Sequence, residues 1–106
     1  MSFVDLNQIS AREVVPGFHG KFVHSEQVTV AFWDIEAGAT LPEHSHVHEQ
    51  VTSVLSGRFE LTVQGETRIL DPGHAIVIPG HVVHSGRALT NCRISDVFHP
   101  ARDDYR

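Results

Sequence analysis

The stretch Gly38–Gly57, GATLPEHSHVHEQVTSVLSG, determines how the rest of this 106-residue chain is interpreted. Histidines occupy every second position from 44 to 48 within it. A second stretch, Gly73–His84 (GHAIVIPGHVVH), is rich in apolar residues and ends in another histidine. We expect the two stretches to build one metal site inside a small β-barrel.

The sequence around these stretches is typical of short β-strands separated by turns. Val28–Ile35 (VTVAFWDI) is rich in β-branched and aromatic residues, which favour strands. Gln64-Gly65 is a tight hairpin signal between two such runs. The expected strands are 12–15, 20–24, 28–35, a short strand from Leu41 that carries His44 and His46, 50–56, 58–63, 66–70, 74–78, 82–85 and 91–98. Because no helical period occurs, the pattern predicts an all-β antiparallel barrel or jelly roll.

Length and composition predict one domain over residues 1–106, with an irregular arm at 1–11 and a charged tail at 99–106. The net charge is −5 without a basic run, which argues against nucleic-acid binding. Cys92 is the only cysteine, so an internal disulfide is excluded and a buried small residue is expected. No segment has the ~20 apolar residues of a membrane span, and we expect a cytoplasmic protein.

The alternation of side chains along a strand would place histidines of the first stretch where they can bind one metal ion. His44 and His46 share one strand face, with α-carbons about 6.6 Å apart. Imidazoles at that spacing can converge on one ion at about 2.0–2.1 Å. Gln50 opens the next strand on its inner face together with Thr52, and strand pairing can bring His84 alongside. A His-x-His pair alone would fit solvated surface histidines equally well.

The complete spacing is more specific. Gly38-x5-His44-x-His46-x3-Gln50-x6-Gly57, followed by Gly73-x5-Pro79-x4-His84, resembles the two-motif signature of the cupin superfamily. The resemblance implies a cupin barrel with a divalent metal ion at positions 44, 46, 50 and 84.

Three positions depart from that signature. The family usually has Glu where Gln50 stands, Asp where His74 stands, and Gly where His81 stands. His81 therefore competes with His84 as the fourth ligand. We interpret His74 as a satisfied or exposed histidine and Glu49 as a rim charge that points away from the ion.

An amide at position 50 has an electrostatic consequence. Three neutral imidazoles and a neutral amide leave the ion its full double charge, which favours Lewis-acid chemistry. The nitrogen-rich set suits Zn, Ni, Fe, Mn or Co, and the sequence does not choose among them.

The last strand and the tail supply candidate pocket residues. Asp96 and Phe98 share a strand face, and Arg102 follows Pro100. A carboxylate, an aromatic wall and a guanidinium near a Lewis-acid metal fit a carboxylated substrate. A capping strand followed by a solvated tail fits the same residues.

Three runs together resemble the small cupins of pectin and alginate degradation, which linearise unsaturated monouronates. These runs are 44–50 (HSHVHEQ), 55–60 (LSGRFE) and 96–105 (DVFHPARDDY). The resemblance implies a catalytic role for Asp96 and Arg102. We also expect Phe98, His48 and Thr52 to line the substrate pocket. Val47 and Ser53, where that family often has Pro and Tyr, depart from its pattern.

Two other functions stay open for such a chain: a cupin dioxygenase, and a non-catalytic cupin that binds a sugar or metabolite. The expected partner is a small anionic sugar acid. Because Val28–Ile35 carries apolar residues on both faces, we also expect a homodimer.

Overall fold

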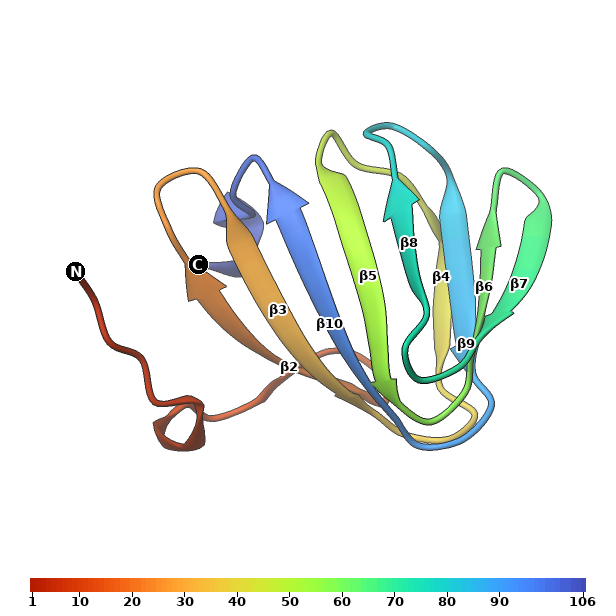
Figure 1. Ribbon diagram of the computed structural model, residues 1–106, viewed down its shortest axis with the longest axis horizontal. Coiled ribbons are helices and arrows are strands. Elements are labelled where there is room, and N and C mark those ends of the chain that lie inside the picture. The colour runs from red at the N-terminus through yellow and green to blue at the C-terminus, as the bar shows by residue number, and fades with distance from the viewer.

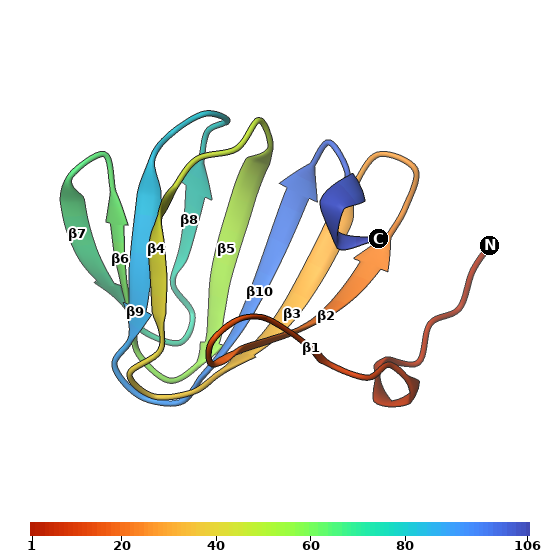
Figure 2. The same cartoon turned by 180° about the vertical axis from the view of Figure 1, so that it is seen from behind.

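The computed structural model describes all 106 residues and consists of two antiparallel β-sheets that curve around a common interior (Figure 1, Figure 2). The larger sheet has the order β1 (Arg12–Val15), β2 (Phe18–His24), β3 (Thr29–Ile35), β10 (Cys92–His99), β5 (Glu49–Ser56) and β8 (Ala75–Ile78). The smaller sheet has the order β4 (Thr40–His44), β9 (His84–Ala88), β6 (Phe59–Val63) and β7 (Glu66–Leu70). The predicted all-β class with jelly-roll strands is confirmed.

Alternation along the central strands builds the interior. In β3 and β10 every second residue is buried, so Trp33 and Ile94, which are paired in register, both point inward. The same alternation in β5 buries Gln50 and Thr52 beside Asp96 of β10. The interior is therefore apolar along most of its length and polar where these three side chains meet.

Two turns show why the sequence folds as predicted. Gln64 and Gly65 have φ of 50° and 79°, the left-handed pair that a two-residue hairpin between β6 and β7 requires. Gly57 ends β5 at φ 82°, and a β-carbon there would lie 2.1 Å from the carbonyl oxygen of Asn91. Only glycine fits that crossing.

The motif segments are less regular than predicted. β4 ends at His44, so His46 lies in the loop before β5 and not in the strand. β9 begins at His84, two residues later than expected, because His81 takes a left-handed φ of 66° in the preceding turn. The two loops are joined directly, since the His81 amide donates to the carbonyl of His46 at 2.7 Å.

The C-terminal segment differs most from expectation. Instead of leaving as a solvated tail, it folds back and ends in the 3-10 helix η2 (Asp103–Tyr105). Arg102 is buried, and its amide donates to Thr29 Oγ1 at 2.8 Å. Arg12 Nη2 donates to the carbonyl of Tyr105 at 2.8 Å and holds the end of the segment against β1.

The N-terminal segment extends away from the barrel and contains the 3-10 helix η1 (Leu6–Gln8) (Figure 1). Lys21 of β2 donates to the carbonyl of Leu6 at 2.9 Å, which ties the arm to the larger sheet. None of the helices has the length and apolar character that crossing a membrane would require.

Candidate metal centre and adjoining pocket

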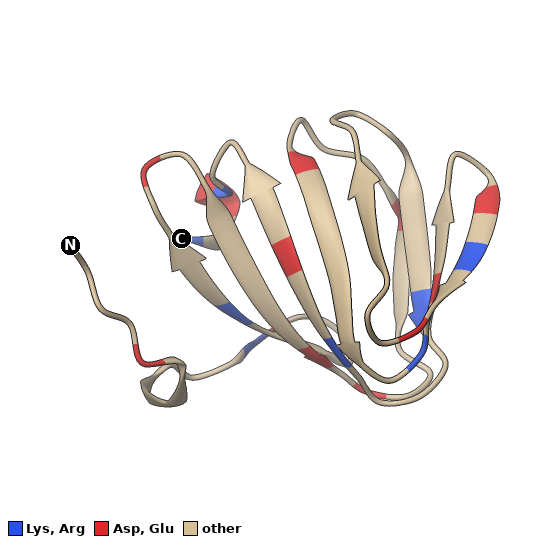
Figure 3. Ribbon diagram, viewed as in Figure 1, with Lys and Arg blue, Asp and Glu red and all other residues tan.

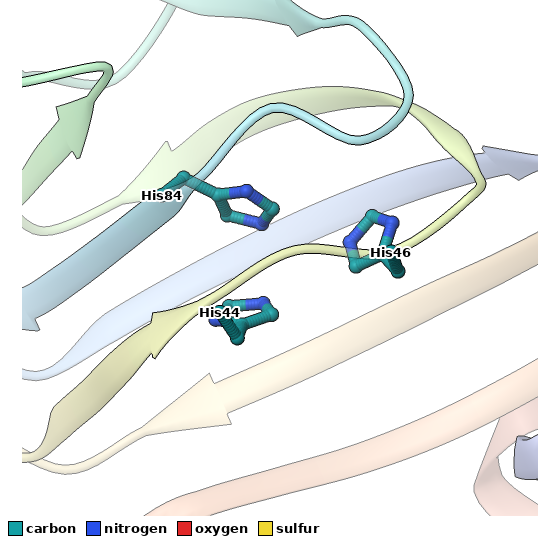
Figure 4. Close-up of side chains that lie close together, drawn as sticks. All are labelled: His44, His46 and His84. Carbon is teal, nitrogen blue, oxygen red and sulfur yellow. The ribbon is translucent and has the colours of Figure 1, made fainter.

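Three histidines converge inside one end of the barrel (Figure 4). His44 ends β4 and pairs in register with His84, the first residue of β9, while His46 comes from the loop. Their ring centroids lie 4.2 to 5.7 Å apart, and one nitrogen of each ring lies within 4.8 Å of the others. Two distant segments thus place three ligating nitrogens around one point.

Backbone carbonyls fix the tautomer of each ring. The Nδ1–H of His44 donates to Pro42 O at 2.8 Å, that of His46 to His48 O at 3.1 Å, and that of His84 to Val82 O at 2.9 Å. Each Nε2 therefore keeps its lone pair, as a metal ligand requires. His84 Nε2 is buried and has no hydrogen-bond partner, which costs free energy unless an ion takes the lone pair.

Gln50 directs an oxygen at the same point. Its Nε2 donates to Thr52 Oγ1 at 2.9 Å and to Asp96 Oδ1 at 3.2 Å, which orients the amide. Its Oε1 then lies 3.1 Å from His46 Nε2. Two lone pairs would face each other at that distance, an arrangement that a shared cation stabilises.

Burial favours the neutral form of two of the three imidazoles, those of His46 and His84. Burial lowers the pKa of His46 to about 4, and the positive charge of Arg102 contributes to that shift. Burial also lowers the pKa of His84. Neutral rings bind a metal without first losing a proton at pH 7. Three imidazoles and an amide oxygen therefore fit a divalent transition ion, whereas His81 is exposed and lies outside the cluster.

Asp96 is a buried carboxyl group beside this cluster. It accepts from Thr52 Oγ1 at 2.6 Å and Gln50 Nε2 at 3.2 Å on Oδ1, and from Trp33 Nε1 at 2.9 Å on Oδ2. Burial raises the pKa of Asp96, while the three donors and Arg102 oppose the rise. A carboxylate has about four acceptor positions, so one remains free, on Oδ2.

Arg102 provides a positive charge at the same end of the barrel. Its guanidinium carbon lies 4.7 Å from the centroid of Phe98 and 4.2 Å from that of Tyr105. Nε and Nη2 donate to Asp104 at 3.0 and 2.7 Å. On the ribbon as a whole, positive and negative residues are interspersed (Figure 3).

A cavity of about 300 Å³ joins these groups. Its lining includes the three histidines and Gln50, Asp96, Phe98 and Arg102, and Arg102 is the sole Lys or Arg among the lining residues. Thr52 also lines it, with its hydroxyl engaged by Gln50 and Asp96. His48 does not line it and packs edge-on against Phe98, with centroids 6.3 Å apart.

Two lining residues, Trp33 and Tyr105, were missed by the sequence reasoning. Trp33 lies in the strand predicted at 28–35, but no local pattern indicates that its indole reaches a residue on β10. Tyr105 belongs to the segment expected to be solvated.

The remaining histidines outside the site include His74, whose Nδ1 accepts from the amide of Asp71 at 3.1 Å.

Comparison of the chain with known protein families identifies the class of protein that the fold and site define. Residues 31–98 match the family model described as Cupin domain, and the chain belongs to that family. The match contains β4 to β9, most of β3 and β10, and all four candidate ligands.

Within the family, the chain is similar to proteins named KdgF. It is 34% identical over 70 residues to the pectin degradation protein KdgF of Dickeya dadantii, a match that spans 64% of each chain. The structure of KdgF from Halomonas sp. is 33% identical, covers 99% of this chain and 100% of that one, and has a TM-score of 0.93. An RmlC-like cupin from Shewanella frigidimarina is 26% identical over 100% of this chain and 96% of its own, with a TM-score of 0.94.

Proposed function

We propose that the protein opens the ring of 4,5-unsaturated monouronates to linear keto acids in pectin or alginate breakdown. The observation that carries the proposal is a single cavity that holds a neutral His/His/Gln/His ligand set, a buried carboxyl group and one guanidinium. Similarity to the KdgF proteins supports the same substrate class.

The reaction moves one proton and breaks one ring bond. The C1 hydroxyl loses its proton, the C1 to ring-oxygen bond breaks as the aldehyde forms, and the electron pair stays on the former ring oxygen at C5. Protonation at C4 then gives the 5-keto acid, so that the atoms of substrate and product are the same.

The ligand set would hold a divalent ion through Nε2 of His44, His46 and His84 and through Oε1 of Gln50. Such an ion supplies Lewis-acid stabilisation of negative charge on a substrate oxygen. Gln50 adds no charge of its own, and its other end contacts the carboxyl group of Asp96.

Asp96 is the proposed proton carrier. Its free acceptor position on Oδ2 can take the C1 hydroxyl proton, and the same group can return a proton to C4. Burial raises the pKa of Asp96, which makes its carboxylate a stronger base than an exposed carboxylate would be. Its three donors hold the carboxylate in one orientation.

Arg102 and Phe98 bind and orient the substrate in this proposal. Arg102 neutralises the substrate carboxylate, and Phe98 forms an apolar wall next to His46, with ring centroids 5.8 Å apart. The apolar remainder of the cavity excludes water from the opened ring.

The test is a rate measurement with an unsaturated monouronate. Protein purified without added metal is analysed for bound ions, and loss of the absorbance of the conjugated double bond is followed against a protein-free blank. We expect faster loss than in the blank, and loss of that acceleration after chelation. Metal-loaded protein that only matches the blank would refute the proposal, and oxygen uptake by iron-loaded protein would favour a dioxygenase instead.

A further inference from the structure

From the packing of the C-terminal segment, we infer that Tyr105 is a positioning residue that holds Arg102 with one edge open to the cavity, and that this edge binds the substrate carboxylate. The inference deepens the proposed function and rests on it for the substrate class. It concerns a residue of the 3-10 helix η2 that belongs to neither motif.

The guanidinium of Arg102 is enclosed on three sides. Phe98 and Tyr105 cover it with their rings, at 4.7 and 4.2 Å from the guanidinium carbon. Asp104 accepts hydrogen bonds from the edge formed by Nε and Nη2. The Asp104 side chain is 55% exposed, whereas the Arg102 side chain is 10% exposed. Asp104 thus holds the guanidinium from the solvent side.

One donor group of Arg102 remains. Asp104 accepts from Nε and Nη2 and leaves Nη1 without a carboxylate partner, and Arg102 lines the cavity. A guanidinium can bind a second carboxylate through its Nη1 and Nη2 edge while the first carboxylate stays in place. This open edge is the cationic feature of the cavity lining.

Tyr105 is itself fixed from three directions. Its ring stacks on Phe22 of β2, with centroids 4.6 Å apart. Its carbonyl accepts from Arg12 Nη2 at 2.8 Å and lies 3.3 Å from His24 Nε2. Strands β1 and β2 therefore set the place of the ring, and the ring sets the place of Arg102.

Loss of the Tyr105 ring should weaken substrate binding and leave the chemical step almost unaffected. A group that holds the substrate carboxylate acts equally on the bound substrate and the transition state, so losing its support raises KM and leaves kcat almost unchanged. Tyr105→Leu removes the ring, and we expect KM to rise about five- to tenfold with kcat within about twofold. Tyr105→Phe keeps the ring and removes only the hydroxyl, which interacts with Arg102, so its KM should stay closer to that of the wild type than the KM of Tyr105→Leu.

A binding assay separates positioning from general loosening of the tail. The probes are D-galacturonate, which lacks the double bond, and its uncharged methyl ester. Calorimetry with metal-loaded protein should show that the wild type prefers the acid and that Tyr105→Leu reduces this preference about fivefold. Asp103→Asn is the matched control, because Asp103 is exposed and pairs with Arg106 alone; it should keep the preference.

Wild-type protein provides an independent measurement. In nitrogen-15 NMR, addition of D-galacturonate should shift the guanidinium signals of Arg102 and leave those of the other arginines in place. The inference is overturned if the Arg102 signals do not move, or if folded Tyr105→Leu keeps both KM and the preference for the acid. Wild type that binds the acid selectively but does not open unsaturated uronates would refute the proposed function and leave this inference standing.

Discussion

Two clusters in this protein bring three potential metal ligands together, and they differ in charge. The interior cluster is His44, His46 and His84, whereas the second consists of Glu13, His19 and Glu36 on the surface. In the interior, every ring nitrogen facing the centre has a free lone pair. On the surface, His19 Nε2 already contacts Glu36 at 2.9 Å and Glu13 at 3.5 Å.

The difference shows that proximity alone does not make a metal site. The surface cluster favours a charged histidine, because the hydrogen bond with Glu36 raises the pKa of His19. The interior cluster favours neutral histidines at two positions, because burial lowers the pKa of His46 and of His84. An ion would therefore supply a positive charge that these two interior rings do not carry.

Removing one interior ligand should have the largest effect. His84→Ala deletes a nitrogen that has no partner in the protein, and we expect the metal affinity to fall by at least about 100-fold, since even groups that only orient ligands contribute 10- to 100-fold. Elemental analysis of the purified variant should then find almost no ion, and ring opening should be lost with it.

His19→Ala is the matched control in the surface cluster. It should retain the metal content and the activity of the wild type. Equal metal loss in both variants would contradict the contrast between the clusters, because it would mean that the ion is not held at the interior site.

Most of the strands were predictable from the sequence for a physical reason, whereas the four candidate ligands followed from the resemblance to the cupin signature. Side chains in a strand alternate with a period of two, and the turns need glycines such as Gly57. The alternation and the glycine positions in the sequence therefore predict the strands and turns of the barrel. The choice between His81 and His84 needed the structure, because it depends on a left-handed turn at His81.

Contacts between distant strands were not predictable. Trp33 reaches Asp96 because β3 pairs with β10, and no local signal in the sequence fixes that pairing. The tail was misjudged because its composition is polar, while its burial depends on aromatic stacking of Tyr105 on Phe22. Sequence patterns thus predict the candidate ligands, and tertiary pairing determines which groups surround them.

Asp96→Asn should have the next largest effect, mainly on the rate. The amide cannot carry the proton, so we expect kcat to fall by about 10²- to 10⁴-fold while the metal stays bound. One amide hydrogen would face the Trp33 N–H and cost about 1 kcal/mol of stability. Glu36→Gln removes a carboxylate from the surface cluster and serves as the control, with an unchanged rate. A wild-type rate for Asp96→Asn would remove Asp96 from the mechanism.

The two clusters should also give opposite pH dependences in metal-free protein. For His46 the folded-state pKa, about 4, lies below the 6.5 of an unperturbed imidazole, so the unfolded chain binds more protons between these values. Its contribution is intact above pH 6.5 and is lost as the pH falls towards 4. After allowance for the partly exposed ring, we expect wild type to lose about 1–2 kcal/mol relative to His46→Gln across this window. Urea unfolding of chelated protein measures this difference, and parallel curves for the two proteins would contradict it.

His19 should show the smallest effect, with the reverse sign. Its folded-state pKa lies above 6.5, because the hydrogen bond with Glu36 stabilises the charged ring. Its stabilising contribution is therefore complete below pH 6.5 and is lost as the pH rises through the folded-state pKa. Since Glu13 and Glu36 are 52% and 65% exposed, solvent and salt screen the interaction, and the change should be small. The measurement compares urea midpoints of wild type and His19→Gln at pH 5.5 and 8.5. The wild type should be the more stable at pH 5.5, and the two should converge at pH 8.5. A difference that grows with pH would mean that His19, like His46, is stabilised in its neutral form, and the two clusters would then no longer differ in kind.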